Sequence, residues 1–343
     1  MSHVIAIDIG GTKIAGALVS DSGDLTPAPV ASLPTPKTGG EDVAATVVEM
    51  VRMVREAAGS AQPLAVGIGS AGVIDPAGRR IVSATDAIPG WGDTELAEIV
   101  EAASGLPVFI ENDVHAHARG EMWKGAGRGR ASALMVAVGT GIGGAIIHGG
   151  QILRGARGLA GHVGHLPASV GQERRCSCGK TGHIEAIAAG PAMTSWYNDQ
   201  LAAGGGAGEA PGAPTVPSVA AVPAVRAGEV PAAPAARRVP VADGRELFDR
   251  ARHGDELAQQ VVQTAGYATG EVIAGLVNAL DPEIVIFGGG LAEAGDPYWP
   301  AVEEGYRNQL MPALAEVPLV VAELKTGAAL LGAAALAWAQ LDA

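Results

Sequence analysis

Short apolar runs alternate with longer stretches of helical spacing along this chain. The helical spacing is clear in residues 42–58 and 257–280, where apolar side chains recur every three or four positions. Polar residues and a glycine at 21–24 predict a turn between two strands. The runs of strand length are residues 4–9, 14–19, 64–69, 108–110, 133–138, 144–147, 284–287 and 319–324. Strands that alternate with helices predict α/β lobes.

One segment, residues 201–238, differs from the rest in composition. Ala, Gly, Pro and Val dominate it, and prolines interrupt it at 211, 214, 217, 223, 231 and 234. Because proline cannot continue a helix or a central strand, we expect a flexible surface insertion. A docking segment is the alternative interpretation.

Composition and charge narrow the class of protein. With 343 residues, of which 48% are hydrophobic, the chain can build two packed lobes. Its formal charge of −13 disfavours nucleic acid and anionic membranes as partners. Small arginine clusters at 128–130, 154–157 and 174–175 are interpreted as solvated loop charges. We expect a cytoplasmic protein, because no apolar leader and no run of about 18 apolar residues is present.

A glycine-rich motif, Asp8-Ile-Gly-Gly-Thr-Lys13, lies between the first two apolar runs. Its glycines predict a tight turn whose backbone N–H groups can face an anion. Asp8 stands at the end of an apolar strand, where nucleotide enzymes commonly use a carboxylate to hold hydrated Mg²⁺ on the phosphates. The predicted phosphate and Mg²⁺ residues here are Asp8, Gly10, Gly11, Thr12 and Lys13.

Two further glycine motifs each follow an apolar strand. They are interpreted as additional contacts for ATP, although each alone could be only a tight turn. The predicted contacts are Gly139, Thr140, Gly141, Gly143, Gly144, Gly288, Gly289 and Gly290. As a set, the glycine motifs predict a nucleotide cleft between two lobes.

Four residues of metal-binding type lie within a short glycine-rich segment. His165, Cys176, Cys178 and His183 offer two imidazoles and two thiolates, which suits a closed, structural tetrahedral Zn²⁺ site. The alternatives are a free thiol pair and ordinary polar histidines. The two cysteines are the only ones in the chain, which excludes a disulfide-stapled secreted domain.

Asp113 is the candidate general base. It follows the apolar strand 108–110 and precedes a helix-like stretch, so its carboxylate is expected at a strand end, where open α/β folds place their ligands. There it can accept the proton of a hydroxyl group that attacks a phosphoryl group. The alternative is that Asp113 merely caps the helix.

The order of these motifs resembles the ROK family of bacterial sugar kinases and related repressors. The resemblance covers nearly the whole chain and implies a two-lobed actin-like ATPase fold, related to ribonuclease H, with the nucleotide and sugar cleft between the lobes. One lobe is expected at 1–115 together with a C-terminal helix at about 328–343. The other is expected at 116–327, with a zinc loop at 162–185 and the insertion at 201–238.

The resemblance also implies roles for single residues. Asp113 would be the general base, and the substrate contacts would be Gly72, Asn112, Asp113, His162, His165 and Glu185. Two positions depart from the usual family pattern. His183 stands where a third zinc cysteine is usual, and His162 stands where a sugar-binding glutamate is usual. The segments 158–165 and 184–190 are similar to bacterial N-acetylmannosamine kinases. Those kinases also carry histidine at the position of His162.

The expected activity is ATP-dependent phosphorylation of the 6-hydroxyl of an amino sugar, N-acetylmannosamine, with Mg²⁺ and structural Zn²⁺. A glucokinase or N-acetylglucosamine kinase is the alternative, although a family sugar-contact asparagine is replaced by Ala87. A sugar-sensing regulator is disfavoured, because only three residues precede the first strand. Polyphosphate stays open as an alternative donor, and a homodimer or homotetramer is expected.

Overall fold

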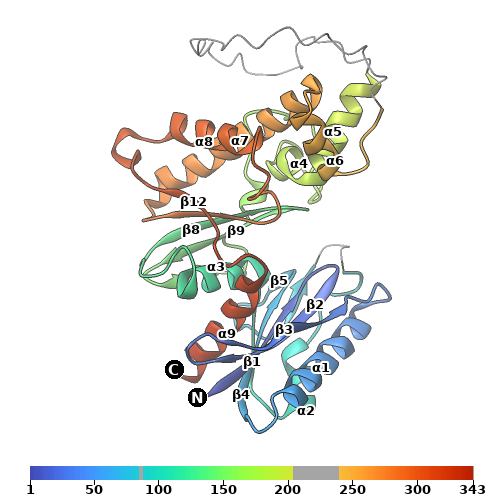
Figure 1. The fold of residues 1–343 in the computed structure, drawn as a ribbon, viewed down its shortest axis with the longest axis vertical. Helices are drawn as coiled ribbons and strands as arrows, with labels where there is room; N and C mark the ends of the chain where they lie inside the picture. The colour runs from blue at the N-terminus through green and yellow to red at the C-terminus, as the bar shows by residue number, and fades with distance from the viewer. Residues whose placement is uncertain (85–87, 204–238, 343) are drawn as a thin grey trace.

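Two five-stranded β-sheets form the framework of the computed structural model, which describes residues 1–84, 88–203 and 239–342 (Figure 1). The predicted alternation of strands and helices is confirmed. Of the predicted insertion, Leu201 and Ala202 end a helix, whereas 204–238 lie outside the described residues. Ala87 lies outside them as well.

The first sheet is built from the N-terminal strands in the order β3-β2-β1-β4-β7. Its strands are β1 (His3–Ile9), β2 (Lys13–Ser20), β3 (Leu25–Pro34), β4 (Pro63–Ser70) and β7 (Val108–Asn112). β1–β2 and β2–β3 pair antiparallel, whereas β1–β4 and β4–β7 pair parallel. Helices α1 (Gly40–Ala57) and α2 (Leu96–Ser104) share an apolar core with this sheet, and a small hairpin, β5 (Val73–Ile74) and β6 (Ile81–Ser83), lies beside it.

The second sheet repeats the same strand order and directions, β10-β9-β8-β11-β12. Its strands are β8 (Ala133–Val138), β9 (Ile142–His148), β10 (Gln151–Ile152), β11 (Val285–Gly288) and β12 (Leu319–Val321). The helices that share the largest apolar core with it are α4 (Glu185–Ala188), α5 (Gly190–Ala202), α6 (Gly244–Arg252), α7 (Glu256–Leu280) and α8 (Tyr298–Gln309). The molecule is therefore a duplicated α/β unit.

Helices α3 (Asp113–Lys124) and α9 (Ala328–Leu341) lie between the two sheets and pack closely on each other (Figure 1). A Cβ atom on Gly120 would lie 2.1 Å from the Ala328 carbonyl oxygen, and one on Gly332 would lie 1.6 Å from that of Ala116. α9 also packs on β1 and β4. The C-terminal helix thus returns to the first sheet, and the boundary expected at residues 115 and 116 falls inside α3.

The structure differs from the strand predictions in two ways. β12 ends at Val321, so residues 322–324 of the predicted run 319–324 are not a strand. Strands β3, β5, β6 and β10 were not predicted, and β3 and β10 lie at the edges of their sheets. Within the described residues, no helix combines the length and apolar character that crossing a membrane requires.

Candidate functional site

The carboxyl ends of three parallel strands bring the predicted carboxylates to one edge of the first sheet. Asp8 pairs with Gly69, and Gly69 pairs with Glu111, so β1, β4 and β7 end together. Asp113 follows directly after the last residue of β7. This edge is where open α/β sheets bind their ligands.

Asn112, and not Asp113, caps helix α3. The Asn112 Oδ1 atom accepts hydrogen bonds from the backbone N–H groups of Val114 at 3.0 Å and His115 at 3.2 Å. Its Nδ2 group donates to the Gly72 carbonyl at 3.0 Å and to Asp113 Oδ1 at 2.9 Å. Asn112 therefore organises Gly72 and Asp113, two of the predicted substrate contacts.

One carboxylate oxygen of Asp113 has no hydrogen bond from another residue. Its Oδ1 atom accepts from Asn112 and from the Val114 N–H at 3.0 Å, whereas no other residue in the part of the chain that the structure describes donates to Oδ2. Burial raises the pKa of Asp113 above its ordinary value, against the lowering effect of those hydrogen bonds. A carboxylate with a raised pKa is a stronger base once it is ionised.

Asp8 lies close enough to Asp113 for the two charges to interact. Burial and the negative charge of Asp113 raise the pKa of Asp8 to about 6, while Lys13 acts in the opposite direction. Two neighbouring carboxylates form a donor set that suits Mg²⁺, because a divalent cation would relieve their repulsion.

The predicted glycine turn joins β1 to β2 at residues 10–12. Residues 35–37 donate hydrogen bonds to the three carbonyl groups of this turn. Thr35 Oγ1 donates to Gly10 O at 2.7 Å, and the Thr35 N–H group donates to Thr12 O at 3.0 Å. Lys37 Nζ donates to Gly11 O at 2.5 Å. These hydrogen bonds fix the conformation of the turn, which lies next to Asp8 in the sequence.

The glycine turns of the second sheet lie side by side. Leu291 N–H donates to Val138 O at 3.0 Å, and Gly190 N–H donates to Gly139 O at 2.8 Å. Gly289 has a φ of +83°, and a Cβ atom there would lie 2.4 Å from Val138 O, so only glycine fits. The turn 139–141 and residues 288–290 thus form one surface.

Gly143 and Gly144 lie within strand β9 and not in this turn. A Cβ atom on Gly143 would lie 2.9 Å from Val114 Cγ2, and one on Gly144 would lie 2.9 Å from Val163 Cγ1. Close packing by α3 and by residues 161–164 accounts for these two glycines, and the glycine turn itself is shorter than the predicted motif 139–144.

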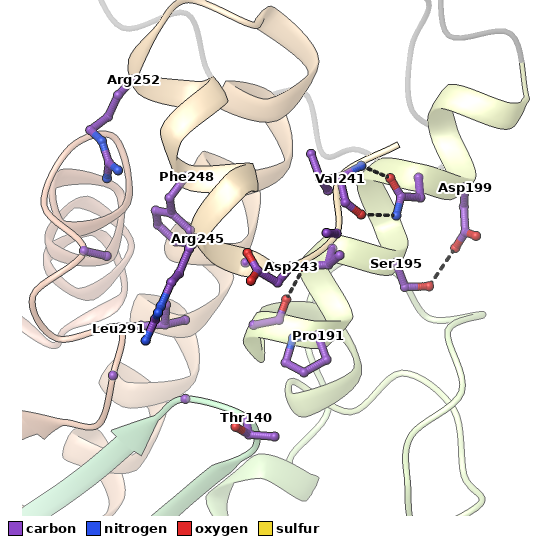
Figure 2. Close-up of a pocket in the computed structure, with 18 residues that line it drawn as sticks. Thr140, Pro191, Ser195, Asp199, Val241, Asp243, Arg245, Phe248, Arg252 and Leu291 are labelled. Carbon is purple, nitrogen blue, oxygen red and sulfur yellow. Dashed lines mark hydrogen bonds between the residues drawn. The ribbon is translucent and has the colours of Figure 1, made fainter. Parts of the chain in front are cut away.

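A cavity of about 990 Å³ opens beside the turns (Figure 2). Sequence reasoning missed its far wall, which is formed by α5 and α6. The residues that line this wall include Pro191, Thr194, Ser195, Asn198, Val241, Asp243, Arg245, Phe248 and Arg252, and those that line the near side include Gly139, Thr140, Gly290 and Leu291. Hydrogen bonds between Asn198 and the Val241 backbone, at 2.9 and 3.0 Å, join the two helical segments. The available sequence signals were helix starts at Gly190-Pro191 and at the N-cap Asp243.

A buried ion-pair network holds the loop 153–161. Glu111 bonds to Arg119 on α3 and to Arg154 beyond β10, each at 2.9 Å. Burial would raise the pKa of Glu111, but the two guanidinium groups outweigh it and hold the pKa below its ordinary value. His115 Nε2 lies 3.1 Å from the Ala160 carbonyl oxygen. The interpretation of Arg154 as a solvated loop charge is therefore wrong, and so is that of Arg174, which pairs with Asp199 at 3.2 Å.

His162 and Glu185 are two of the predicted substrate contacts. Burial lowers the pKa of His162 below its ordinary value, which favours the neutral form of the ring. Glu185 accepts from Ser177 Oγ at 2.7 Å and from the Ile142 N–H at 3.0 Å. Glu185 thus connects the cysteine loop to the start of β9.

The four predicted metal ligands converge. The ligand atoms of His165, Cys176, Cys178 and His183 all lie within 4.8 Å of one another. His165 Nδ1 lies 3.4 Å from Cys176 Sγ, and His183 Nδ1 lies 3.3 Å from Cys178 Sγ. These spacings are compatible with a tetrahedral zinc site. Because the Nδ1 atom of His165 faces the cluster, its Nε2 atom is the one that a substrate could contact.

Comparison with known proteins gives a consistent set of relatives. The model of the ROK family matches residues 4–340. The chain is 31% identical over 334 residues to a glucokinase of Thermotoga maritima, covering 97% of this chain and 96% of the relative. It is 32% identical over 339 residues to an N-acetylmannosamine kinase of Shigella flexneri, covering 97% and 98%. The structure resembles that of a ROK hexokinase from Thermus thermophilus, with a TM-score of 0.79, 35% identity and 99% of each chain covered.

Proposed function

The chain belongs to the ROK family and has its actin-like ATPase fold, and we propose that it is an ATP-dependent kinase that phosphorylates the 6-hydroxyl of an amino sugar, N-acetylmannosamine. The observation that carries this proposal is the Oδ2 atom of Asp113 at the end of β7, to which no other described residue donates. The relatives are sugar kinases that match over nearly their whole length, which supports the same reaction class here.

In the proposed reaction, Asp113 accepts the proton of the sugar hydroxyl as the hydroxyl oxygen attacks the γ-phosphoryl group. The raised pKa of Asp113 supports this role, because a more basic carboxylate is a better proton acceptor. Asn112 holds the other carboxylate oxygen, so the carboxylate cannot rotate freely. Mg²⁺, held by Asp8, would neutralise charge on the transferring phosphoryl group.

The nucleotide is proposed to lie in the cavity beside the glycine turns. Glycines at 139, 190 and 290 let the backbone approach the phosphates, and apolar side chains such as Phe248 and Leu291 suit a nucleoside. This arrangement would direct the γ-phosphate toward Asp113. It supports ATP as the donor over polyphosphate, which has no apolar part to bury.

His162 supports the amino sugar as substrate. Because burial favours the neutral imidazole, the ring offers one donor nitrogen and one acceptor nitrogen. A single acceptor suits the N–H group of an acetamido substituent. The usual family glutamate offers several acceptor sites and can bind two hydroxyls. The similarity to the N-acetylmannosamine kinase of Shigella flexneri points the same way.

Glucokinase activity is the second candidate, since a glucokinase matches with nearly the same identity. A coupled ADP-release assay over hexoses and N-acetylhexosamines separates the two. We expect the highest kcat/KM for N-acetylmannosamine. A higher value for glucose would replace the proposed substrate, whereas the absence of sugar-dependent ADP release would contradict the kinase itself.

A further inference from the structure

Within the described residues, the backbone passes between the two sheets at two places. Residues 125–132 connect α3 to β8, and residues 322–327 connect β12 to α9. Both crossings begin or end on the same helix pair, because α3 and α9 pack backbone to backbone. The helix pair packs on the first sheet, α3 also shares an apolar cluster with the second sheet, and both crossings lead from the pair to the second sheet.

One buried side chain, Glu121 in the last turn of α3, bonds to both crossings. Its Oε2 atom accepts from the N–H groups of Ala126 at 2.9 Å and Glu323 at 3.2 Å, and its Oε1 atom accepts from the Leu324 N–H at 2.8 Å. Its backbone carbonyl accepts from the N–H groups of Gly125 and Gly127, each at 3.0 Å. A single residue thus holds the two crossings together.

The surroundings of Glu121 are built for this contact. The side chain has no solvent exposure, and burial of a carboxylate is costly unless hydrogen bonds compensate. A Cβ atom on Gly125 would lie 2.1 Å from Glu121 Oε2, so the first crossing needs glycine at this position. His117 Nε2 lies 3.9 Å from Oε1, too far for a hydrogen bond, so the backbone amides are the partners that hold the carboxylate.

Resting on the proposed function, we propose that Glu121 is a positioning residue for phosphoryl transfer. By holding the two crossings together, it fixes the orientation of the second sheet, with its glycine turns, relative to Asp113. Asp113 begins α3 and Glu121 lies in the last turn of the same helix, and the turn 139–141 follows β8, the strand reached by the first crossing. The direction of β8 relative to α3 therefore decides where the γ-phosphate lies. Misplacement by about 1 Å can cost on the order of 100-fold in rate.

The test is Glu121→Gln, because the amide nitrogen of glutamine cannot accept a hydrogen bond. We expect kcat to fall about 10- to 100-fold while KM for sugar and for ATP changes less than about threefold, since neither binding surface is altered. Solution scattering should give a larger radius of gyration for the ligand-free variant, because the two crossings are no longer held together.

Glu283→Gln is the matched control. Glu283 is exposed, and its Oε2 atom accepts from the N–H groups of Ala131 at 2.6 Å and Ser132 at 2.8 Å, on the first crossing alone. We expect this variant to keep the wild-type kcat and radius of gyration. A Glu121→Gln protein with wild-type kcat, or an equal loss of kcat in both variants, would overturn the proposal.

If Glu121→Gln does not fold, the variant Gly125→Ala tests the same role of Glu121. The φ of Gly125 is −116°, so alanine strains no left-handed backbone and acts by displacing the Glu121 carboxylate. The same loss of kcat is expected, and an unchanged kcat would refute this role of Glu121. A wild-type protein without ADP release would refute the proposed function alone; the radius of gyration of the ligand-free proteins would still decide the role of Glu121.

Discussion

At the residue scale, the proximity of the Asp8 and Asp113 carboxylates lowers the stability of the folded protein when both are ionised. Burial and Asp113 raise the pKa of Asp8 to about 6, above the value of 3.8 expected in the unfolded chain. Between these two values the folded state retains a proton that the unfolded state has released, so stability falls as the pH rises from about 4 to about 6. The cost is fully present above the folded-state pKa.

We therefore expect Asp8→Asn to raise the melting temperature at pH 8 by several degrees in Mg²⁺-free buffer. The gain should shrink below pH 6 and disappear as the pH falls below 3.8, where Asp8 becomes neutral in the unfolded state as well. Differential scanning calorimetry of both proteins at these pH values measures it. A gain that is the same at pH 4 and pH 8, or no gain at all, would show that the Asp8 charge is not strained.

His162 is expected to tune the choice of sugar. In His162→Glu, an acceptor-only group replaces the imidazole, and the relative kcat/KM should shift about tenfold toward glucose, because one exchanged hydrogen bond is worth roughly 0.5–1.5 kcal/mol. His162→Gln, which retains both a donor and an acceptor, is the matched control and should shift the ratio less. Both sugars are measured on each preparation together with a melting curve. An unchanged ratio with lower stability would make His162 a packing residue only.

At the element scale, patterns within a single strand or turn were predictable, and contacts between elements were not. The first glycine turn and helix α7 follow from local spacing. The length of the second turn does not, because the glycines at 143 and 144 are needed for packing by Val114 and Val163, which approach from elsewhere in the chain. The α5–α6 wall of the cavity was missed for the same reason, since residues 204–238 separate the two helices in the sequence.

The cysteine loop gives a prediction at this scale. We expect about one zinc per chain, because four ligand atoms converge. Elemental analysis of protein purified without chelator measures it. Cys176→Ser should lose the metal, whereas His183→Cys, which restores the usual family ligand, should retain it. Zinc-free wild-type protein with full activity would contradict the site.

At the scale of the whole molecule, the proposed site combines segments that are far apart in the sequence. The first sheet supplies Asp8 and Asp113, and the second sheet supplies the glycine turns and the cavity. The family resemblance implied this division, whereas composition and spacing could not have shown which residue joins the parts. Glu121 and Glu111 look like ordinary helix and strand residues in the sequence, and only the tertiary structure reveals their partners.

The most direct test of the central claim is the turnover number of Asp113→Asn with N-acetylmannosamine and ATP. Asparagine preserves the shape of the side chain and removes the proton acceptor, so kcat should fall about 10²- to 10⁴-fold with little change in KM for the sugar. Asp255→Asn is the matched control. Asp255 is the N-cap of α7, asparagine is an equally good N-cap, and this variant should retain the wild-type kcat. Near-wild-type turnover of a folded Asp113→Asn protein would contradict the account.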